Sequence, residues 1–178
     1  MIGHAVPADA PAGETLPAAQ EPGSGGRTTW SVVAVERGLN TAIVVGNHFG
    51  EGHRRRHHRR RYTATDLADA GPGYGLVTSV DLTRRTILWQ NRFAGGALGG
   101  ALATAGGLVF VGESSGFIDA FAADTGRLLW HFQLGAGVNA PPVAFAAGGT
   151  EYIAVAVGGN TRVHSATGDT LAVFHLPH

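Results

Sequence analysis

The densest group of chemically active side chains is the run His53-Arg-Arg-Arg-His-His-Arg-Arg-Arg61, in which three imidazoles lie among six guanidinium groups. Imidazoles bind metal ions and clustered arginines bind phosphates, so a zinc site and a nucleic-acid patch are the chemistries to weigh. Six neighbouring cations repel a divalent ion, the ligand spacing does not fit zinc, and no aromatic residues interleave to stack on bases. The run is better explained as a solvated insertion loop, or as a segment altered by a shifted reading frame.

The other candidate groups are weaker. The histidines His131, His164, His175 and His178 occur singly, without the serine–histidine–acid or HExxH spacing of known hydrolases. The glycine-rich stretch 95–100 does not open a helix, so it fits a connector better than a phosphate-binding loop. We predict no catalytic residue and no metal ligand from these patterns.

Composition narrows the fold class. The chain has 178 residues, 44% of them hydrophobic, with 28 glycines and no cysteine, so disulfides and thiolate chemistry are excluded. Many glycines and few charges favour an all-β protein with many turns over a helical bundle. The formal net charge is zero, although six of the 13 basic residues lie in residues 53–61, and no nucleic-acid-binding fold supports a nucleic-acid partner. We expect no membrane span, and the first residues lack the pattern of a signal peptide.

Three regions follow from the composition along the chain. Residues 1–27 are rich in proline and glycine and have neither a strand nor a helix period, which predicts a loose N-terminal arm. Residues 28–178 contain short apolar runs separated by turn residues, which predicts β-strands. Within them, residues 51–72 form a low-complexity Arg/His insertion.

An internal repeat organises the strand region. Gly75 and Trp89 enclose a segment that resembles the segment from Gly116 to Trp130, and the two glycines have the same offset as the two tryptophans. This offset falls within the period of roughly 40 to 45 residues that is typical of the four-stranded blades of a β-propeller. We therefore predict an all-β partial propeller of about three four-stranded blades. A complete blade is expected between residues 100 and 134, with strands near 101–104, 107–112, 116–122 and 127–133.

The segments 104–112, 122–130, 135–142 and 168–177 resemble, in order and spacing, the last blades of the PQQ-dependent (quinoprotein) alcohol dehydrogenases, where PQQ is pyrroloquinoline quinone. This resemblance covers residues 74–178, and it implies that the chain is a fragment of an eight-bladed propeller. It also implies that a tryptophan late in each blade docks on the next blade. Trp89 and Trp130 are expected to have this role.

The resemblance carries expectations about chemistry. The family transfers a hydride from an alcohol to PQQ, with Ca²⁺ or a lanthanide as the metal. It implies that Trp30, Gly158, Gly159 and Asn160 contact the cofactor, whereas the family's base and metal ligands have no recognisable counterpart in this chain. It further implies a periplasmic location, the remaining blades or a companion chain as partner, and a cytochrome c as electron acceptor.

The chain departs from the family's repeat in two turns. Arg85 stands where glycine is usual, and Ala122 stands where aspartate is usual. The aspartates Asp81 and Asp124 are expected to form turns rather than to catalyse, because such carboxylates accept backbone N–H groups.

Two functions follow as alternatives. The first is the C-terminal part of a PQQ-dependent alcohol dehydrogenase-like oxidoreductase that is not competent alone. The second is a non-catalytic β-propeller module that acts as a protein-interaction scaffold, which would need only the docking tryptophans. The sequence also leaves open whether the chain is a truncated or frame-shifted gene product.

Overall fold

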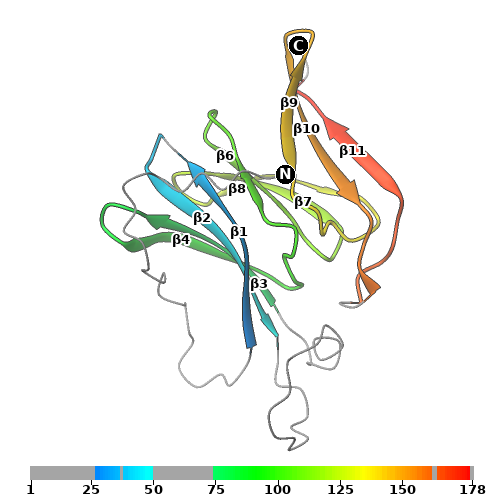
Figure 1. Ribbon diagram of the computed structural model, residues 1–178, viewed down its shortest axis with the longest axis horizontal. Coiled ribbons are helices and arrows are strands. Elements are labelled where there is room, and N and C mark those ends of the chain that lie inside the picture. Colours follow the sequence, from blue (N-terminus) through cyan, green and yellow to red (C-terminus); the bar gives the residue numbers. More distant parts are fainter. Residues whose placement is uncertain (1–26, 37, 50–73, 162–163, 177–178) are drawn as a thin grey trace, which may run out of the picture.

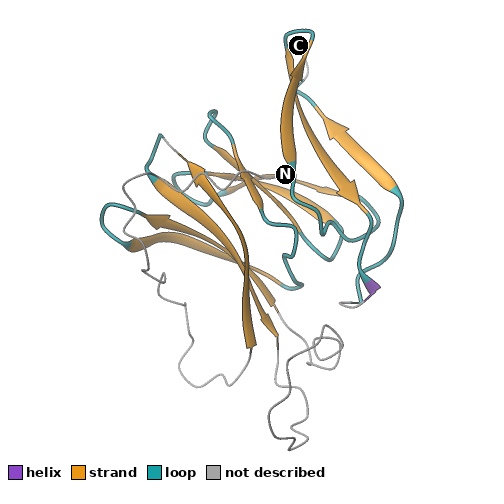
Figure 2. Ribbon diagram, in the orientation of Figure 1, coloured by secondary structure: helices purple, strands orange, loops and turns teal. Residues whose placement is uncertain are grey.

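The computed structural model describes residues 27–36, 38–49, 74–161 and 164–176, with only the backbone of residues 27–36, 48 and 49. These residues form eleven strands arranged in three antiparallel sheets (Figure 2). The expected arm, apart from Arg27, and the expected Arg/His insertion lie outside the described residues.

The three sheets follow one another along the chain and across the molecule (Figure 1). The first sheet has the order β1 (Arg27–Glu36), β2 (Thr41–Phe49), β3 (Tyr74–Asp81) and β4 (Thr86–Phe93). The second has the order β5 (Ala101–Ala103), β6 (Leu108–Gly112), β7 (Phe117–Ala122) and β8 (Leu128–Gln133). The third has the order β9 (Val143–Ala147), β10 (Thr150–Val157) and β11 (Thr170–Phe174).

The predicted blades agree with these sheets. Each of the four strands expected between residues 100 and 134 is present within one residue of its expected ends, as β5 to β8. The all-β propeller architecture is confirmed, and within the described residues the third sheet has three strands instead of four.

The repeat is reproduced in strand register as well as in sequence. The β3–β4 ladder shifts between Ser79 and Val80, so that Leu88 is an extra residue beside Trp89. The β7–β8 ladder shifts at the equivalent position of the next repeat, between Ala120 and Phe121. A β-bulge of this kind bends a strand and increases its twist. The two outer strands therefore present their tryptophans in the same way.

The turn before each outer strand is also repeated. Arg85 has φ 58° and donates its N–H to the carbonyl of Asp81 at 2.7 Å. Gly126, its equivalent in the next repeat, has φ 67° and donates to the carbonyl of Ala122 at 2.8 Å. Glycine adopts positive φ without steric cost and arginine does not, so the departure at Arg85 leaves the turn intact but strained.

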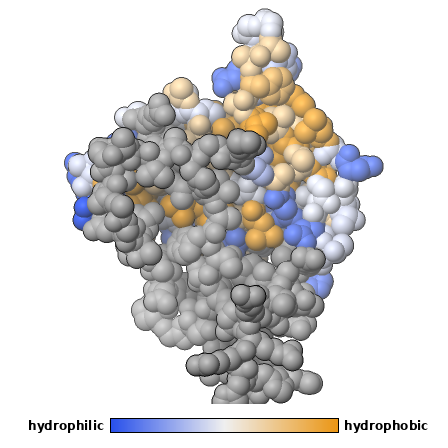
Figure 3. Space-filling view, in the orientation of Figure 1, coloured by the Kyte–Doolittle hydropathy of each residue, from blue (hydrophilic) through white to orange (hydrophobic). Residues whose placement is uncertain are grey.

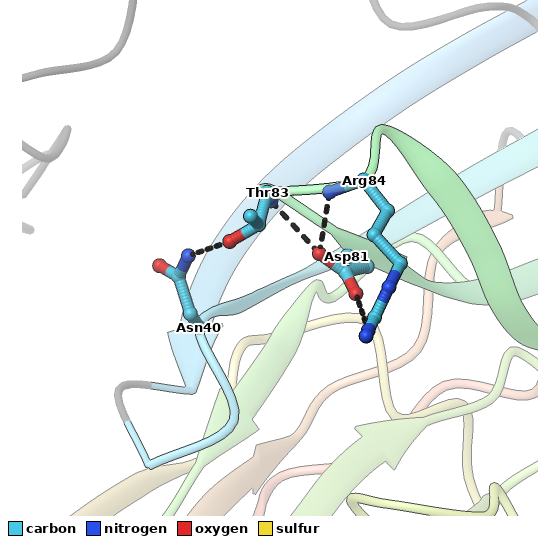
Figure 4. A network of polar contacts seen from close by, with 4 residues as sticks. All are labelled: Asn40, Asp81, Thr83 and Arg84. Carbon is cyan, nitrogen blue, oxygen red and sulfur yellow. Dashed lines mark hydrogen bonds and ion pairs between the residues drawn. The ribbon is translucent and has the colours of Figure 1, made fainter.

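Asp81 stabilises this strained turn, as the sequence predicted. Its Oδ1 accepts the N–H groups of Thr83 and Arg84, each at 2.8 Å, and its Oδ2 lies 3.0 Å from the Arg84 guanidinium (Figure 4). The backbone N–H of Arg84 is the main cause that lowers the pKa of Asp81. Asn40 donates to the Thr83 hydroxyl at 2.8 Å and links the β1–β2 turn to this one.

Replacing Arg85 with glycine should relieve the strain. We expect Arg85→Gly to raise the free energy of unfolding by about 0.5–1 kcal/mol, because the hydrogen bond to Asp81 is a backbone bond and survives. Arg84→Gly is the matched control and should lower stability, since it removes the ion pair and adds backbone entropy. Urea unfolding followed by circular dichroism measures both, and a loss of stability in Arg85→Gly would show that its positive φ is not strained.

The first and second sheets pack face to face around Trp89. Its ring lies over the Gly126 turn, where an added Cβ would meet the ring at 2.5 Å, and its Nε1 donates to the carbonyl of Ala123 at 2.8 Å. Phe121 contacts both Trp89 and Phe93, with centroids 6.4 and 6.0 Å apart. The predicted docking of Trp89 on the next blade is confirmed.

The second and third sheets pack through two smaller clusters. One joins Ile118 and Val138 to Val155 and Val157, and the other joins Phe110 to Ile153. Trp130 also reaches the third sheet, with its ring edge-on to Phe174 at 5.2 Å. Each sheet therefore buries one face against the next, as blades of a propeller do.

Candidate functional site

The predicted cofactor residues Gly158, Gly159 and Asn160 follow β10 and form one loop at the end of the third sheet. Gly159 has φ 68°, and an added Cβ there would meet the Ala166 carbonyl oxygen. Only glycine fits this position. Gly158 is exposed and differs from its neighbour, because the nearest atom to an added Cβ, the Gly168 carbonyl oxygen, lies 4.0 Å away.

Ser165 holds the end of this loop. Its Oγ accepts the backbone N–H of Asn160 at 2.7 Å and lies 3.3 Å from the carbonyl of the same residue, to which it can donate. Asn160 and Ser165 also form an isolated antiparallel bridge. Because Ser165 is buried, losing its hydroxyl would leave the loop's polar groups unsatisfied.

The connector between the second and third sheets lies directly against the same loop. Gly137 donates its N–H to Ala166 at 2.8 Å and accepts that of Gly159 at 2.9 Å. An added Cβ at Gly137 would meet the Ser165 hydroxyl at 2.5 Å, so the approach is close. The loop is therefore fixed from two sides by backbone contacts.

Polar side chains continue this arrangement toward the first sheet. We call Asn47, Ser114, Asn139 and Ser165 the polar rim. Asn139 donates to the Ser165 hydroxyl at 2.9 Å and accepts from the Ser114 hydroxyl at 2.8 Å. The Ser114 N–H donates to Gly96 at 2.8 Å, and buried Asn47 binds both backbone groups of neighbouring Ala97. The rim thus links the loop ends of all three sheets.

The chemistry of the polar rim is limited to hydrogen bonding. Its members are amides and hydroxyls, which orient a ligand but do not titrate near neutral pH. Within the residues that the structure describes, no group of three or more His, Asp or Glu side chains is placed to hold a metal ion. The rim can position groups, and nothing in its residue types supplies an acid or base.

One carboxyl pair lies beside the rim, where half-buried Glu113 directly precedes Ser114 and interacts with buried Asp119 of β7. Asp119 is 4% exposed, stands opposite Val111 and His131 in the β-ladders, and interacts with Glu113. Burial, and then the hydrogen bond with Glu113, raises the pKa of Asp119 to about 8. The Ser115 hydroxyl donates to Glu113 Oε2 at 2.7 Å. Sequence reasoning missed this pair, although an acid inside the apolar run of β7 was a signal.

Trp30, the fourth predicted cofactor residue, lies in β1 opposite Gly46. It belongs to the first sheet, whereas Gly158, Gly159 and Asn160 belong to the third. Its side chain lies outside the described part of the chain, so its contact with a cofactor stays a prediction.

Comparison with known proteins decides the family. The family model described as "PQQ: Glucose/ethanol/alcohol dehydrogenase, beta-propeller domain" matches residues 52–153, more than half of the 178 residues. The chain belongs to this family. The resemblance to the quinoprotein alcohol dehydrogenases is thereby confirmed.

Individual relatives of the quinoprotein family agree. The quinoprotein alcohol dehydrogenase PedE of Pseudomonas putida is 40% identical over 84 residues, which are 47% of this chain and 13% of that protein. The 1-butanol dehydrogenase (quinone) of Thauera butanivorans is 44% identical over 85 residues, which are 47% of this chain and 13% of that protein. The quinoprotein glucose dehydrogenase of Gluconobacter oxydans is 30% identical over 128 residues, and the match covers 60% of this chain and 16% of that protein. The chain thus spans less than a fifth of the length of these relatives.

Solved quinoprotein structures share the fold. The quinohemoprotein alcohol dehydrogenase of Comamonas testosteroni has a TM-score of 0.58 at 18% identity, over 80% of this chain and 25% of that one. A europium-containing methanol dehydrogenase has a TM-score of 0.52 at 21% identity, over 71% and 24%. These similarities support the propeller architecture of this quinoprotein segment.

The loop residues fit a planar quinone as one wall of its site. An added Cβ at Gly158 would meet only the Gly168 carbonyl oxygen, at 4.0 Å, whereas the space beside Gly159 is filled by Ala166. The N–H groups of Gly159 and Asn160, however, already donate to Gly137 and Ser165. The loop can therefore lie against the flat face of a ring, and it offers few backbone donors for the carboxylates of PQQ.

In the described part of the chain, no helix is long and apolar enough to cross a bilayer.

Proposed function

We propose that this chain supplies the closing blades of a PQQ-dependent alcohol dehydrogenase-like oxidoreductase and one wall of its cofactor site. The observation that carries the proposal is the Gly158–Asn160 loop, which is fixed by Ser165 and Gly137 and leaves open space beside Gly158. Trp30 contributes to the same site in this proposal. When bound, PQQ with Ca²⁺ or a lanthanide supplies the electron-pair acceptor for oxidation of an alcohol carbon.

The residues of this chain have a positioning role in that reaction. The Ser165 hydroxyl accepts the Asn160 N–H at 2.7 Å, and Asn139 donates to the same hydroxyl at 2.9 Å. These bonds hold the loop in place. Gly158 lets the ring approach the backbone, because a side chain there would occupy the same space. Proton transfer from the alcohol is assigned to residues outside this chain. The chain alone is therefore proposed to be inactive.

The proposed setting follows from the same role. The remaining blades, in the same or a companion polypeptide, complete the ring and bring the base and the metal ligands. The enzyme is proposed to work in the periplasm and to pass electrons to a cytochrome c. The substrate is proposed to be a primary alcohol or a related hydroxyl compound.

A chimaera tests the proposal. Residues 74–176 would replace the corresponding segment of the quinoprotein ethanol dehydrogenase of Pseudomonas putida, which is 39% identical over 84 residues. We expect the chimaera to bind PQQ, and we expect Gly158→Val to weaken this binding at least tenfold. Gly106→Val is the matched control, because an added Cβ there also has open space, with its nearest neighbour at 3.8 Å.

Equilibrium titration with PQQ in the presence of Ca²⁺ measures the affinities. Circular dichroism first establishes that all three proteins are folded. Equal PQQ affinity in the Gly158→Val and Gly106→Val chimaeras would show that the loop does not line the cofactor site. A folded chimaera that binds no PQQ would refute the proposal as a whole.

A further inference from the structure

Asp119 is a buried acid inside the apolar strand β7. It alternates along the strand with Ile118 and Ala120, which face the third sheet, so it lies on the same face as Phe121, which packs on the first sheet. Its carboxyl forms a hydrogen bond with Glu113 in the turn after β6. An ionised carboxylate only accepts hydrogen bonds, so two carboxyls form such a bond only when one of them keeps a proton. The fold therefore contains a carboxyl pair that shares a proton.

Few other charged groups lie near this pair. His131 of β8 stands opposite Asp119 in the β-ladder. The two connectors beside the pair, residues 94–100 and 134–142, contain no charged or titratable residue. The described charged side chains of the first sheet belong to the turn after β3 or stack on the Tyr74 ring, and they are Asp81, Arg84, Arg85 and Arg92. Within the described residues, the charge of the pair therefore depends on its own two carboxyls and on His131.

The backbone of Glu113 connects the pair to the connector between the second and third sheets. The Glu113 carbonyl accepts the N–H of Val138 at 2.9 Å. Val138 directly follows Gly137, whose carbonyl accepts the N–H of Gly159 at 2.9 Å. A movement of Glu113 can therefore reach the Gly158–Asn160 loop through this connector.

Side chains of the polar rim provide a second connection. Ser114 directly follows Glu113, and its hydroxyl donates to Asn139 at 2.8 Å. Asn139 donates to the Ser165 hydroxyl at 2.9 Å, and this hydroxyl accepts the N–H of Asn160 at 2.7 Å. Figure 3 shows the third sheet, in the region of β9 to β11, as a hydrophobic part of the surface, with blue and white residues where β10 ends. The polar contacts are thus gathered at the loop end of the sheets.

Loss of the shared proton would disturb both connections. Two ionised carboxylates at hydrogen-bond distance repel each other, and the buried one has lost its hydration. Asp119 is held within β7, between β6 and β8, whereas half-buried Glu113 lies in a turn and can move toward solvent. Such a movement shifts Ser114 and strains the hydrogen bond to Val138. The loop then loses support from both sides.

We propose that Asp119 and Glu113 are positioning residues for the Gly158–Asn160 loop, which their shared proton holds in place and the loss of this proton releases. The link between the pair and the loop does not depend on the cofactor. Its effect on PQQ rests on the proposed function, in which the loop is one wall of the cofactor site. We expect PQQ to bind more tightly while the pair keeps its proton.

Nuclear magnetic resonance of the isotope-labelled natural chain, without PQQ, tests the link. We expect the carbonyl ¹³C shifts of Gly159 and Asn160, and that of the Asn139 side chain, to change in one step with a midpoint at about pH 8. Asp119→Asn should abolish this step, because an amide does not ionise and still imitates the neutral carboxyl.

Glu113→Gln is a second variant that keeps the contact between the two side chains. Its amide can accept from a protonated Asp119 and donate to an ionised one, so we expect a step that is smaller by about fivefold or more. Asp124→Asn is the matched control and should keep the full step, because Asp124 is an exposed turn residue of the same sheet. Loop shifts that stay constant between about pH 6 and pH 9, or that change equally in Asp119→Asn, would overturn the inference.

The PQQ affinity of the chimaera with residues 74–176 tests the effect on the cofactor. We expect the affinity to fall by about threefold or more from pH 7 to pH 9, and to fall less in the Asp119→Asn chimaera. Equal pH profiles of two chimaeras that bind PQQ would overturn this inference and leave the proposed function standing. A folded chimaera that binds no PQQ would refute the proposed function, whereas the step in the carbonyl shifts would still establish the link between the pair and the loop.

Discussion

Trp89→Ala should lower the free energy of unfolding by about 3–5 kcal/mol, whereas Trp130→Ala should lower it by less than about 2 kcal/mol. The two residues occupy equivalent positions of the repeat, yet only Trp89 is buried and donates a hydrogen bond, to Ala123. Removing Trp89 leaves a cavity between the first two sheets. Removing Trp130 takes away only partly exposed aromatic contacts with Phe132 and Phe174.

Urea unfolding followed by far-ultraviolet circular dichroism measures both tryptophan variants without relying on tryptophan fluorescence. Trp89→Phe is a milder variant that keeps an aromatic ring but loses the donor to Ala123, and we expect a loss of about 1–2 kcal/mol. It remains informative if Trp89→Ala does not fold. Equal losses for Trp89→Ala and Trp130→Ala would mean that packing between the first two sheets does not depend on this docking contact.

Asp119 should make the protein less stable as the pH rises from about 4 to about 8. The pKa of Asp119 is raised from 3.8 to about 8 by burial and by Glu113, so in this window the folded chain keeps a proton that the unfolded chain has released. Stability then falls with pH, by up to about 1.4 kcal/mol per pH unit. The stabilisation that the proton on Asp119 gives the folded chain is complete below pH 3.8 and lost above about pH 8.

Asp119→Asn should remove this dependence. The amide imitates the neutral carboxyl and can donate to Glu113, so we expect a gain on the order of 3 kcal/mol at pH 8 and a small change at pH 4. Asp124→Asn is the control, because Asp124 is an exposed turn residue whose carboxylate accepts from the Thr125 hydroxyl at 3.1 Å. Thermal unfolding between pH 4 and 8 measures all three proteins. A natural chain whose pH profile runs parallel to that of Asp119→Asn would exclude a proton on Asp119.

The local pattern of the sequence was enough to predict the sheets. Glycine-bounded apolar runs and the internal repeat predicted the strands of the second sheet and the turn at Asp81, and the family resemblance implied the docking of Trp89. The positive φ of Arg85 follows from the same alignment, because the repeat places it at the position of Gly126. These features depend on contacts that recur with the repeat.

The polar rim and the Asp119–Glu113 pair were not predicted, because they depend on how the strands and their connections pack together. Asn139 and Ser165 are 26 residues apart and meet only when the second and third sheets pack. Asn47 lies in β2 and Ala97 in the connection between β4 and β5, 50 residues apart. The raised pKa of Asp119 comes from burial and from Glu113. Periodicity along one strand does not specify such partners.

The central claim is that these blades belong to a quinoprotein propeller whose chemistry needs residues from elsewhere. A dye-linked alcohol oxidation assay of the purified chain with PQQ and Ca²⁺ tests it most directly, with ethanol as substrate and the complete Pseudomonas putida ethanol dehydrogenase as positive control. We predict no turnover above the rate with PQQ and Ca²⁺ alone. Robust PQQ-dependent turnover by the chain itself would contradict this account.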